Sequence, residues 1–255
     1  MTSNSSSNKN NDGHIAFRSG NPALSSKTFE NIERTSDNVM TVDGTVNKVA
    51  ISLILLLVSG YFTYTRELLP LAFVGAIGGL IVAIVTIFKK QWSPITVPIY
   101  SLLQGLFLGG ISYIFNQLYD GIVLQAVLLT GSILFSLLFA YKSGLIKATE
   151  NFKLGVTAAT GGIFIVYMIS FVMSFFGSGL PILDINNSSL MSIGFSLFVV
   201  VIASLNLVLD FDFIEQGAEM GAPKYMEWYG AFGLLVTLIW LYIEILRLLA
   251  KLRGR

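Results

Sequence analysis

The sequence predicts an all-α membrane protein, a polytopic bundle of about seven helices. The chain has 255 residues, of which 54% are hydrophobic and only 12% charged. Its mean hydropathy of +0.72 lies well above that of ordinary soluble domains. Apolar stretches close to the length needed to cross a bilayer recur along the chain, and the connections between them are short. Most of the chain is therefore expected to lie in lipid.

The N-terminal segment, residues 1–46, differs from the rest. It opens on a run rich in Ser and Asn and holds the single histidine, His14. A segment this polar buries too little apolar surface to fold by itself, and it lacks the basic-then-apolar pattern of a secretory signal. We expect residues 1–46 to form a retained, disordered tail and residues 47–255 to form the transmembrane domain.

Seven apolar runs follow the tail in order. Their approximate limits are residues 49–64, 68–88, 95–115, 122–141, 154–176, 190–209 and 229–249. Gly and Pro punctuate the connections, as at Pro94, Gly121, Gly144, Pro181 and Pro223. Each run except the first reaches the length of a spanning helix, and the first can extend back through Lys48, whose long side chain reaches the interface.

Small residues recur within the runs. They fall into three groups: Gly75, Gly78 and Gly79; Gly105, Gly109 and Gly110; and Gly161 and Gly162. Glycine lets helix backbones approach closely in membranes. We interpret these positions as packing sites within one bundle.

Basic residues near the ends of the runs predict the orientation of the chain. With a cytoplasmic N-terminus, the inner side collects Arg34, Lys48, Lys89, Lys90, Lys142, Lys147, Lys153 and Lys224. The outer side then holds only Arg66 before the last run. The sequence therefore predicts a multi-pass protein of the inner (plasma) membrane with its N-terminus in the cytoplasm.

The basic C-terminal end disagrees with that rule. Arg247, Lys251, Arg253 and Arg255 would lie outside if the seventh run crosses fully. Either the chain makes an even number of crossings, with one segment re-entrant, or the early helices dominate and the tail violates the rule. We expect seven crossings and an extracytoplasmic Arg255.

The composition argues against several classes of function. No cysteine is present, so disulfides, thiolate metal sites and cysteine nucleophiles are excluded. With His14 as the only histidine, a Ser–His dyad or a His-based zinc site cannot be built. The net charge of +1 and the absence of a basic stripe argue against nucleic acid as a partner. We expect no enzymatic activity and no resident cofactor.

Ionisable residues within the spans are the candidate functional residues, because an unpaired charge in lipid is costly. They are Asp210, Asp212, Glu227 and Glu244. Glu244 precedes Arg247 by three residues, which puts both on one helical face. This spacing is consistent with a local ion pair or with a carboxylate that faces the bundle interior and shares a proton with a second acid.

Asp210 and Asp212 are two positions apart in the sequence, so on a helix they point about 200° apart. We expect one to face the interior and the other the headgroups, although both are also consistent with solvated acids at the start of a connector. Gln104 and Asn206 are the other polar residues of interest. We interpret them as interhelical hydrogen-bonding groups.

Several motifs then resemble a known family. The stretches 241–249, 209–212 and 104–112 are similar to the Bax-inhibitor family of seven-helix membrane proteins. The stretches 21–24 and 40–48 resemble its longer bacterial branch. The resemblance covers residues 21–253, and although each motif is short, their order and spacing together are specific.

The resemblance implies six helices around a central seventh and a pH-sensitive calcium leak governed by two carboxylates, one on each of the last two helices. Carried onto this chain, those carboxylates are Asp210 and Glu244, which also become the candidate calcium ligands. Carboxylate oxygens suit this hard cation. One difference is that Gln104 stands where the third helix of the family usually has a Glu.

The spacing of the acids suggests alternates for the pair. If the turn between the last two helices centres near Met220, the residue facing Asp210 is near Gly230, which makes Glu227 the closest acid of the seventh helix. Glu244 would then lie about 30 Å along the helix from Lys224. We therefore keep Asp210 with Glu244 as the candidate gate and Glu227 and Asp212 as alternates.

Two functions remain open. The first is a pH-sensitive leak for calcium or other cations, gated by a carboxylate pair that shares one proton. The second is a non-conducting regulator that binds another membrane protein, such as a quality-control protease, through its N-terminal tail. Loss of the tail should spare ion flux under the first and abolish function under the second.

Overall fold

The protein is described by a computed structural model that covers residues 39–177 and 179–254. These residues include seven long α-helices and no β-strand. The helices are α1 (Val42–Arg66), α2 (Leu69–Phe88), α3 (Ser93–Leu118), α4 (Ile122–Lys142), α5 (Glu150–Ser174), α6 (Leu190–Glu219) and α7 (Met226–Arg253). All seven are long and apolar enough to cross a membrane. The predicted multi-pass all-α fold is confirmed.

The helix starts follow from side-chain caps. Thr41 accepts a hydrogen bond from Gly44 N at 3.0 Å and begins α1, and Thr149 and Ser189 cap α5 and α6 in the same way. Because of this cap, residues 42–46 belong to α1 and not to the expected tail. Residues 1–38, with His14 and the motif at 21–24, lie outside the described residues.

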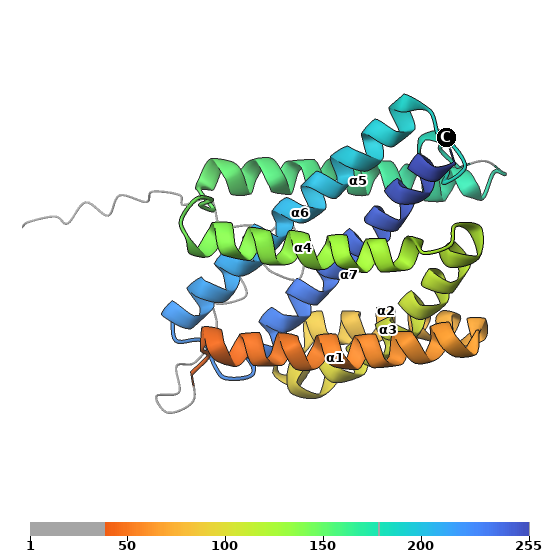
Figure 1. The fold of residues 1–255 in the computed structure, drawn as a ribbon. Helices are drawn as coiled ribbons and strands as arrows, with labels where there is room; N and C mark the ends of the chain where they lie inside the picture. Colours follow the sequence, from red (N-terminus) through yellow and green to blue (C-terminus); the bar gives the residue numbers. More distant parts are fainter. Residues whose placement is uncertain (1–38, 178, 255) are drawn as a thin grey trace, which may run out of the picture.

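Helix α7 is the most buried of the seven and lies at the centre of the bundle. It packs against α1, α3, α4 and α6, while α2 packs mainly on α3 and α5 mainly on α6. Figure 1 shows α6 and α7 crossing obliquely between a layer formed by α1, α2 and α3 and a layer formed by α4 and α5. The main apolar core surrounds α7.

The helices run alternately between two ends of the bundle (Figure 1). We name these the Val42 end, where α1 begins, and the Arg66 end, where α1 and α7 finish. Helix α7 extends over 28 residues between the two ends, so it is not a short re-entrant segment. The described residues thus contain seven helices of spanning length, which is consistent with seven crossings.

Two of the three glycine groups pack as expected. A Cβ on Gly105 or Gly109 would overlap α1, and one on Gly75 would overlap the backbone of α3. Gly161 and Gly162 differ, because a Cβ there would meet nothing within 4 Å. The interpretation of these two glycines as packing sites within the bundle is therefore wrong, since α5 turns them away from the other helices.

Candidate functional site

Three acidic residues lie in the interior of the α6–α7 hairpin. Asp210 and Glu227 have no exposed surface and Glu244 is 3% exposed. A carboxyl group in such a setting needs a partner or must give up its charge. The surroundings of the three acids differ, and this difference defines the candidate site.

Asp210 lies about two thirds of the way along α6, nine residues before its end at Glu219, and faces α7. Neither of its carboxyl oxygens accepts a hydrogen bond within the described residues. The hydroxyl of Thr237 on α7 lies beside it, and no cationic side chain of the described residues acts on it. Asp210 is therefore a buried acid without a compensating charge.

Glu244 lies further along α7 and has a cationic partner. Arg247 Nη1 donates to Glu244 Oε1 at 3.2 Å, which confirms the ion pair that the spacing suggested. Tyr167 of α5 lies beside the Glu244 carboxyl. The Arg247 guanidinium stacks over the Tyr167 ring, 5.7 Å from its centroid. Glu244 is thus held at the junction of α5, α6 and α7.

The register of the hairpin separates Asp210 from Glu244. Asp210 lies opposite Thr237, and Ser196 lies opposite Lys251, which it contacts. In this register Glu244 is level with Ala203, and it lies seven residues beyond Thr237 on the same face of α7. That interval corresponds to about 10 Å along a helix. The two carboxyls therefore do not share a proton directly in this conformation.

The turn position predicted from spacing is wrong. A turn near Met220 would place Gly230 opposite Asp210, but α6 continues to Glu219 and α7 begins at Met226. Gly221, with a φ of 68°, lies in the connector between them, and this left-handed conformation favours glycine. The connector moves the centre of the hairpin toward the C-terminus, which places Thr237 opposite Asp210.

Glu227 is consequently not the partner of Asp210. It precedes Thr237 by ten residues, about 15 Å along the helix. Its Oε1 accepts from Thr41 N at 3.0 Å and Thr41 Oγ1 at 2.9 Å, and it pairs with Lys224 at 2.7 Å. Glu227 joins the start of α1 to the start of α7 at the Val42 end of the bundle.

Asp212 points away from Asp210, as its helical position predicts. Its carboxyl group has partners within the protein and is not left to the lipid headgroups. Lys153 Nζ of α5 lies 2.6 Å from Asp212 Oδ2, and Gln216 Nε2 donates to the same oxygen at 2.6 Å. Lys153 is itself buried, although its place near the end of an apolar run predicts only a charge that orients the chain. Its position four residues into an apolar helix is the signal that could have revealed the pair.

Lys251 is a buried residue that sequence reasoning missed. The sequence groups it with a basic tail, but it lies inside α7 and is 1% exposed. Its Nζ donates to Ile182 O at 2.8 Å and Ser196 Oγ at 2.9 Å. This residue ties the connector before α6 to the last turns of α7. The clustering of Lys251 with other basic residues near the C-terminus gives no sign of such burial.

Gln104 and Asn206 join neighbouring helices. Asn206 Nδ2 donates to Thr160 Oγ1 of α5 at 2.8 Å, which confirms its interhelical bond. Gln104 packs over Gly79 of α2, where an added Cβ would lie 2.6 Å from Gln104 Nε2. The glutamine of α3 therefore faces α2 rather than the acids of α6 and α7.

No group of three or more His, Asp or Glu side chains in the described part of the chain is arranged to hold a metal ion. Asp210 and Glu244, the candidate calcium ligands, are about two helical turns apart. Two carboxyls at these levels are too far apart to bind one calcium ion together, because calcium–oxygen distances are about 2.3–2.6 Å.

Similarity to known proteins agrees with this seven-helix architecture. A family profile described as Bax inhibitor 1 like matches residues 21–254, nearly the whole chain. The chain belongs to the Bax inhibitor 1 like family. The matched region contains all seven helices and every candidate acid. No curated protein and no solved structure shows significant similarity to this Bax inhibitor 1 like protein.

Proposed function

We propose that this Bax inhibitor 1 like protein is a pH-sensitive leak for cations, with calcium as the favoured ion, controlled by Asp210. The observation that carries the proposal is the complete burial of this carboxyl within a spanning helix, without a cationic partner among the described residues. Ionisable residues at such depth typically mark an ion or proton path. Oxygen ligands of this kind suit calcium.

The proposed switch follows from desolvation. An ionised Asp210 enclosed by apolar side chains is unfavourable, so loss of its proton favours an arrangement that admits water or a cation. The cations Lys153 and Arg247 do not neutralise Asp210, because Lys153 pairs with Asp212 and Arg247 pairs with Glu244. Rising pH would therefore open the leak, and protonation would close it.

The two-carboxylate gate implied by the family resemblance takes a modified form in this proposal. Asp210 and Glu244 lie on one side of the hairpin at two levels, about 10 Å apart. We propose that Asp210 responds to pH and that Glu244, paired with Arg247, is the next polar group that an ion meets toward the Arg66 end. An ion would meet the two carboxyls in succession and not together.

The proposed setting is the inner (plasma) membrane with a cytoplasmic Val42 end. Most of the basic residues counted for the inner side lie near this end in the described structure. Lys48 and Lys90 contact the rings of Trp228 and Tyr229 there, at 5.5 and 5.7 Å from the centroids. Positive charge near short cytoplasmic loops favours this orientation.

The test is calcium flux into proteoliposomes as a function of pH. Wild-type protein should give a flux that rises with pH, and Asp210→Asn should flatten this dependence at a low flux. Asp212→Asn is the matched control, because the same change two residues away removes an acid that is already paired. The proposal fails if wild-type vesicles conduct no better than empty ones at every pH, or if both variants flatten the response equally.

A second function, a non-conducting regulator of another membrane protein, is supported by a separate contact. Met40 N donates to Ala222 O at 2.6 Å, and Val39 forms a β-bridge with Pro223. The segment that follows residues 1–38 is thus fastened to the α6–α7 connector, where a bound partner could act on the hairpin. Removing residues 1–38 should spare flux if the protein is a leak and abolish function if it is a regulator.

We also propose that the protein is not an enzyme. Besides the lack of cysteine in the sequence, its one histidine is His14 in the polar N-terminal segment. Incubation of the pure protein with peptide and phospholipid substrates should release no product. Hydrolysis that disappears in Asp210→Asn would overturn this statement.

A further inference from the structure

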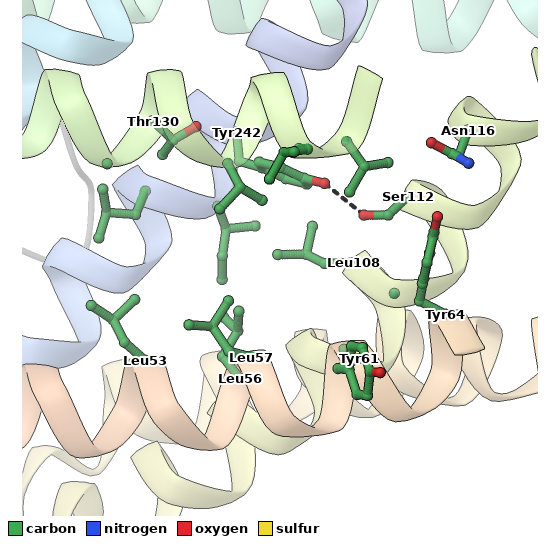
Figure 2. Close-up of a pocket in the computed structure, with 18 of the residues that line it drawn as sticks. Leu53, Leu56, Leu57, Tyr61, Tyr64, Leu108, Ser112, Asn116, Thr130 and Tyr242 are labelled. Carbon is green, nitrogen blue, oxygen red and sulfur yellow. Dashed lines mark hydrogen bonds between the residues drawn. The ribbon is translucent and has the colours of Figure 1, made fainter. Parts of the chain in front are cut away.

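A groove of about 610 Å³ runs along the side of the bundle, and Asp210, Glu227 and Glu244 are not among the residues that line it. Helices α1 and α4 form its walls, and α3 and α7 form its floor. Figure 2 shows leucines from α1 and α3 lining it, with Tyr64 and Asn116 together at one end. Among the described residues, no extensive contact joins α1 to α4 across the opening.

The groove opens toward lipid. Leu57 and Tyr61 of α1 and Leu124 of α4 border it and are strongly exposed. All three belong to spanning helices, so their exposed surface faces the bilayer and not water. Leu235, Leu238 and Tyr242 of α7 border it from below and are buried.

Polar groups midway along the groove are already bonded within the protein. The Ser112 and Tyr242 hydroxyls form a hydrogen bond of 2.6 Å, drawn in Figure 2, and Thr130 Oγ1 donates to Ala126 O at 2.8 Å. The middle of the groove is therefore compatible with a hydrocarbon chain and offers little to a polar ligand.

The end of the groove toward the Arg66 end is polar. Tyr64, Asn116 and Asp120 line it there. Arg253 lies at the same place, since its Nη1 donates to Asp120 O at 2.6 Å and its Nη2 to Gln125 Oε1 at 3.0 Å. The groove thus matches an amphiphile with an apolar chain and a polar end, where the Arg253 guanidinium can attract a phosphate and the Asp120 carboxylate opposes it.

The length of the groove agrees with one leaflet of the bilayer. From Leu53 to Tyr64, α1 extends about 16 Å. Half of a hydrocarbon core about 30 Å thick is about 15 Å. Tyr64, two residues before the end of α1, is then placed at the headgroup level, where tyrosine is typically enriched.

We propose that this groove binds one acyl chain of a phospholipid from the leaflet at the Arg66 end. The chain lies between α1 and α4 against Leu238 and Tyr242, and its phosphate group lies near Asn116 and Arg253. The groove residues Leu235, Leu238 and Tyr242 lie about 100–160° around α7 from Thr237, at about 100° per residue. The lipid therefore contacts a different face of α7 from the one that faces Asp210.

The test uses a phosphatidylglycerol whose acyl chain carries a diazirine, mixed into vesicles that contain the full-length protein. After irradiation, peptide mass spectrometry should find adducts on residues 235–242 of α7. Lipid-facing residues of α5, such as Phe164 and Ile165, serve as an internal reference for ordinary contact with the bilayer.

Gly131→Leu is the matched variant, because a Cβ on this groove-lining glycine meets nothing within 4 Å and a larger side chain can fill the space. Its α7 adducts should fall several-fold relative to the α5 adducts. Gly194→Leu, an equally open glycine on α6, should leave the ratio unchanged. If Gly131→Leu does not fold, Val127→Trp on the same wall gives the same readout, with Val172→Trp on α5 as its control.

The proposal is overturned if wild-type protein shows α5 adducts without α7 adducts, or if Gly131→Leu keeps the wild-type ratio. Labelling of α7 by a diazirine fatty acid but not by the phospholipid would also contradict it, because the polar end would then not hold a phosphate. If α7 carries no lipid adduct and a separate chemical cross-linker joins groove residues of two chains, a second copy of the chain is the occupant instead.

Discussion

The carboxyl group of Asp210 on α6 lies beside the hydroxyl of Thr237 on α7, within the contact between these two antiparallel spanning helices. This contact reflects the register of the hairpin, in which no cation of the described residues lies beside the acid. Asp212, two residues away, pairs with Lys153. Of these two acids on one helix, the ionised form of Asp210 is therefore unfavourable, whereas that of Asp212 is stabilised by Lys153.

Thermal stability should separate these two acids. Asp210→Asn should raise the unfolding temperature of the protein in micelles, and the gain should grow as the pH rises, because wild-type Asp210 must ionise in an apolar site and asparagine need not. Asp212→Asn should lower it, since Lys153 then loses its partner. Scanning fluorimetry across a pH series measures both. Destabilisation by Asp210→Asn at every pH would contradict the assignment.

The Glu244–Arg247 pair should show coupling in a double-mutant cycle. Arg247→Leu should cost more than Glu244→Gln, because it leaves the acid buried and unpaired while Arg247 is partly exposed. The expected loss for Arg247→Leu is about 1–2 kcal/mol, reduced from that of a fully buried pair by this exposure. The double variant should recover part of it. Strict additivity in reversible unfolding would rule out the pair as a stabilising contact.

Close packing at the start of α1 predicts a contrast between two glycines. Gly44→Ala should destabilise the protein strongly, because the added Cβ would overlap the Glu227 carboxyl that binds Thr41. Gly161→Ala should have little effect or a small stabilising one, since nothing lies within 4 Å and alanine favours helix. Unfolding temperatures of the two variants test this, and equal effects would argue against the Thr41–Glu227 contact.

Lys251 should protect the connector before α6, residues 179–189, from cleavage by a protease. Lys251→Met removes the donor to Ile182 O and Ser196 Oγ, so the connector should detach and become sensitive to chymotrypsin within residues 179–189. Leu252→Ala changes the adjacent, half-exposed residue and serves as the control. The contact is not needed for order if both variants and the wild type are cleaved at the same rate.

Seven crossings predict opposite locations for the two ends of the chain. A reporter fused at Met1 should read as cytoplasmic, and one fused after residue 255 should read as extracytoplasmic. Paired fluorescent and phosphatase fusions measure both sides. A cytoplasmic signal from both ends would require one of the seven helices to turn back within the membrane.

The membrane class, the number of helices and most of their limits were predictable from the amino-acid sequence, because lipid demands long apolar helices with satisfied backbones. The candidate acids were predictable too, since charged residues within such runs are rare. The Glu244–Arg247 pair belongs with them, because it depends only on spacing within one helix.

Contacts between helices could be read only from the folded structure. The partners of Asp210, Asp212 and Lys251 depend on the register of α6 against α7 and on the side of α6 that α5 covers. Register follows from the connector at Gly221 and from side-chain packing along the whole hairpin, and neither is visible in periodicity. The groove between α1 and α4 likewise exists only because α7 holds these two helices apart.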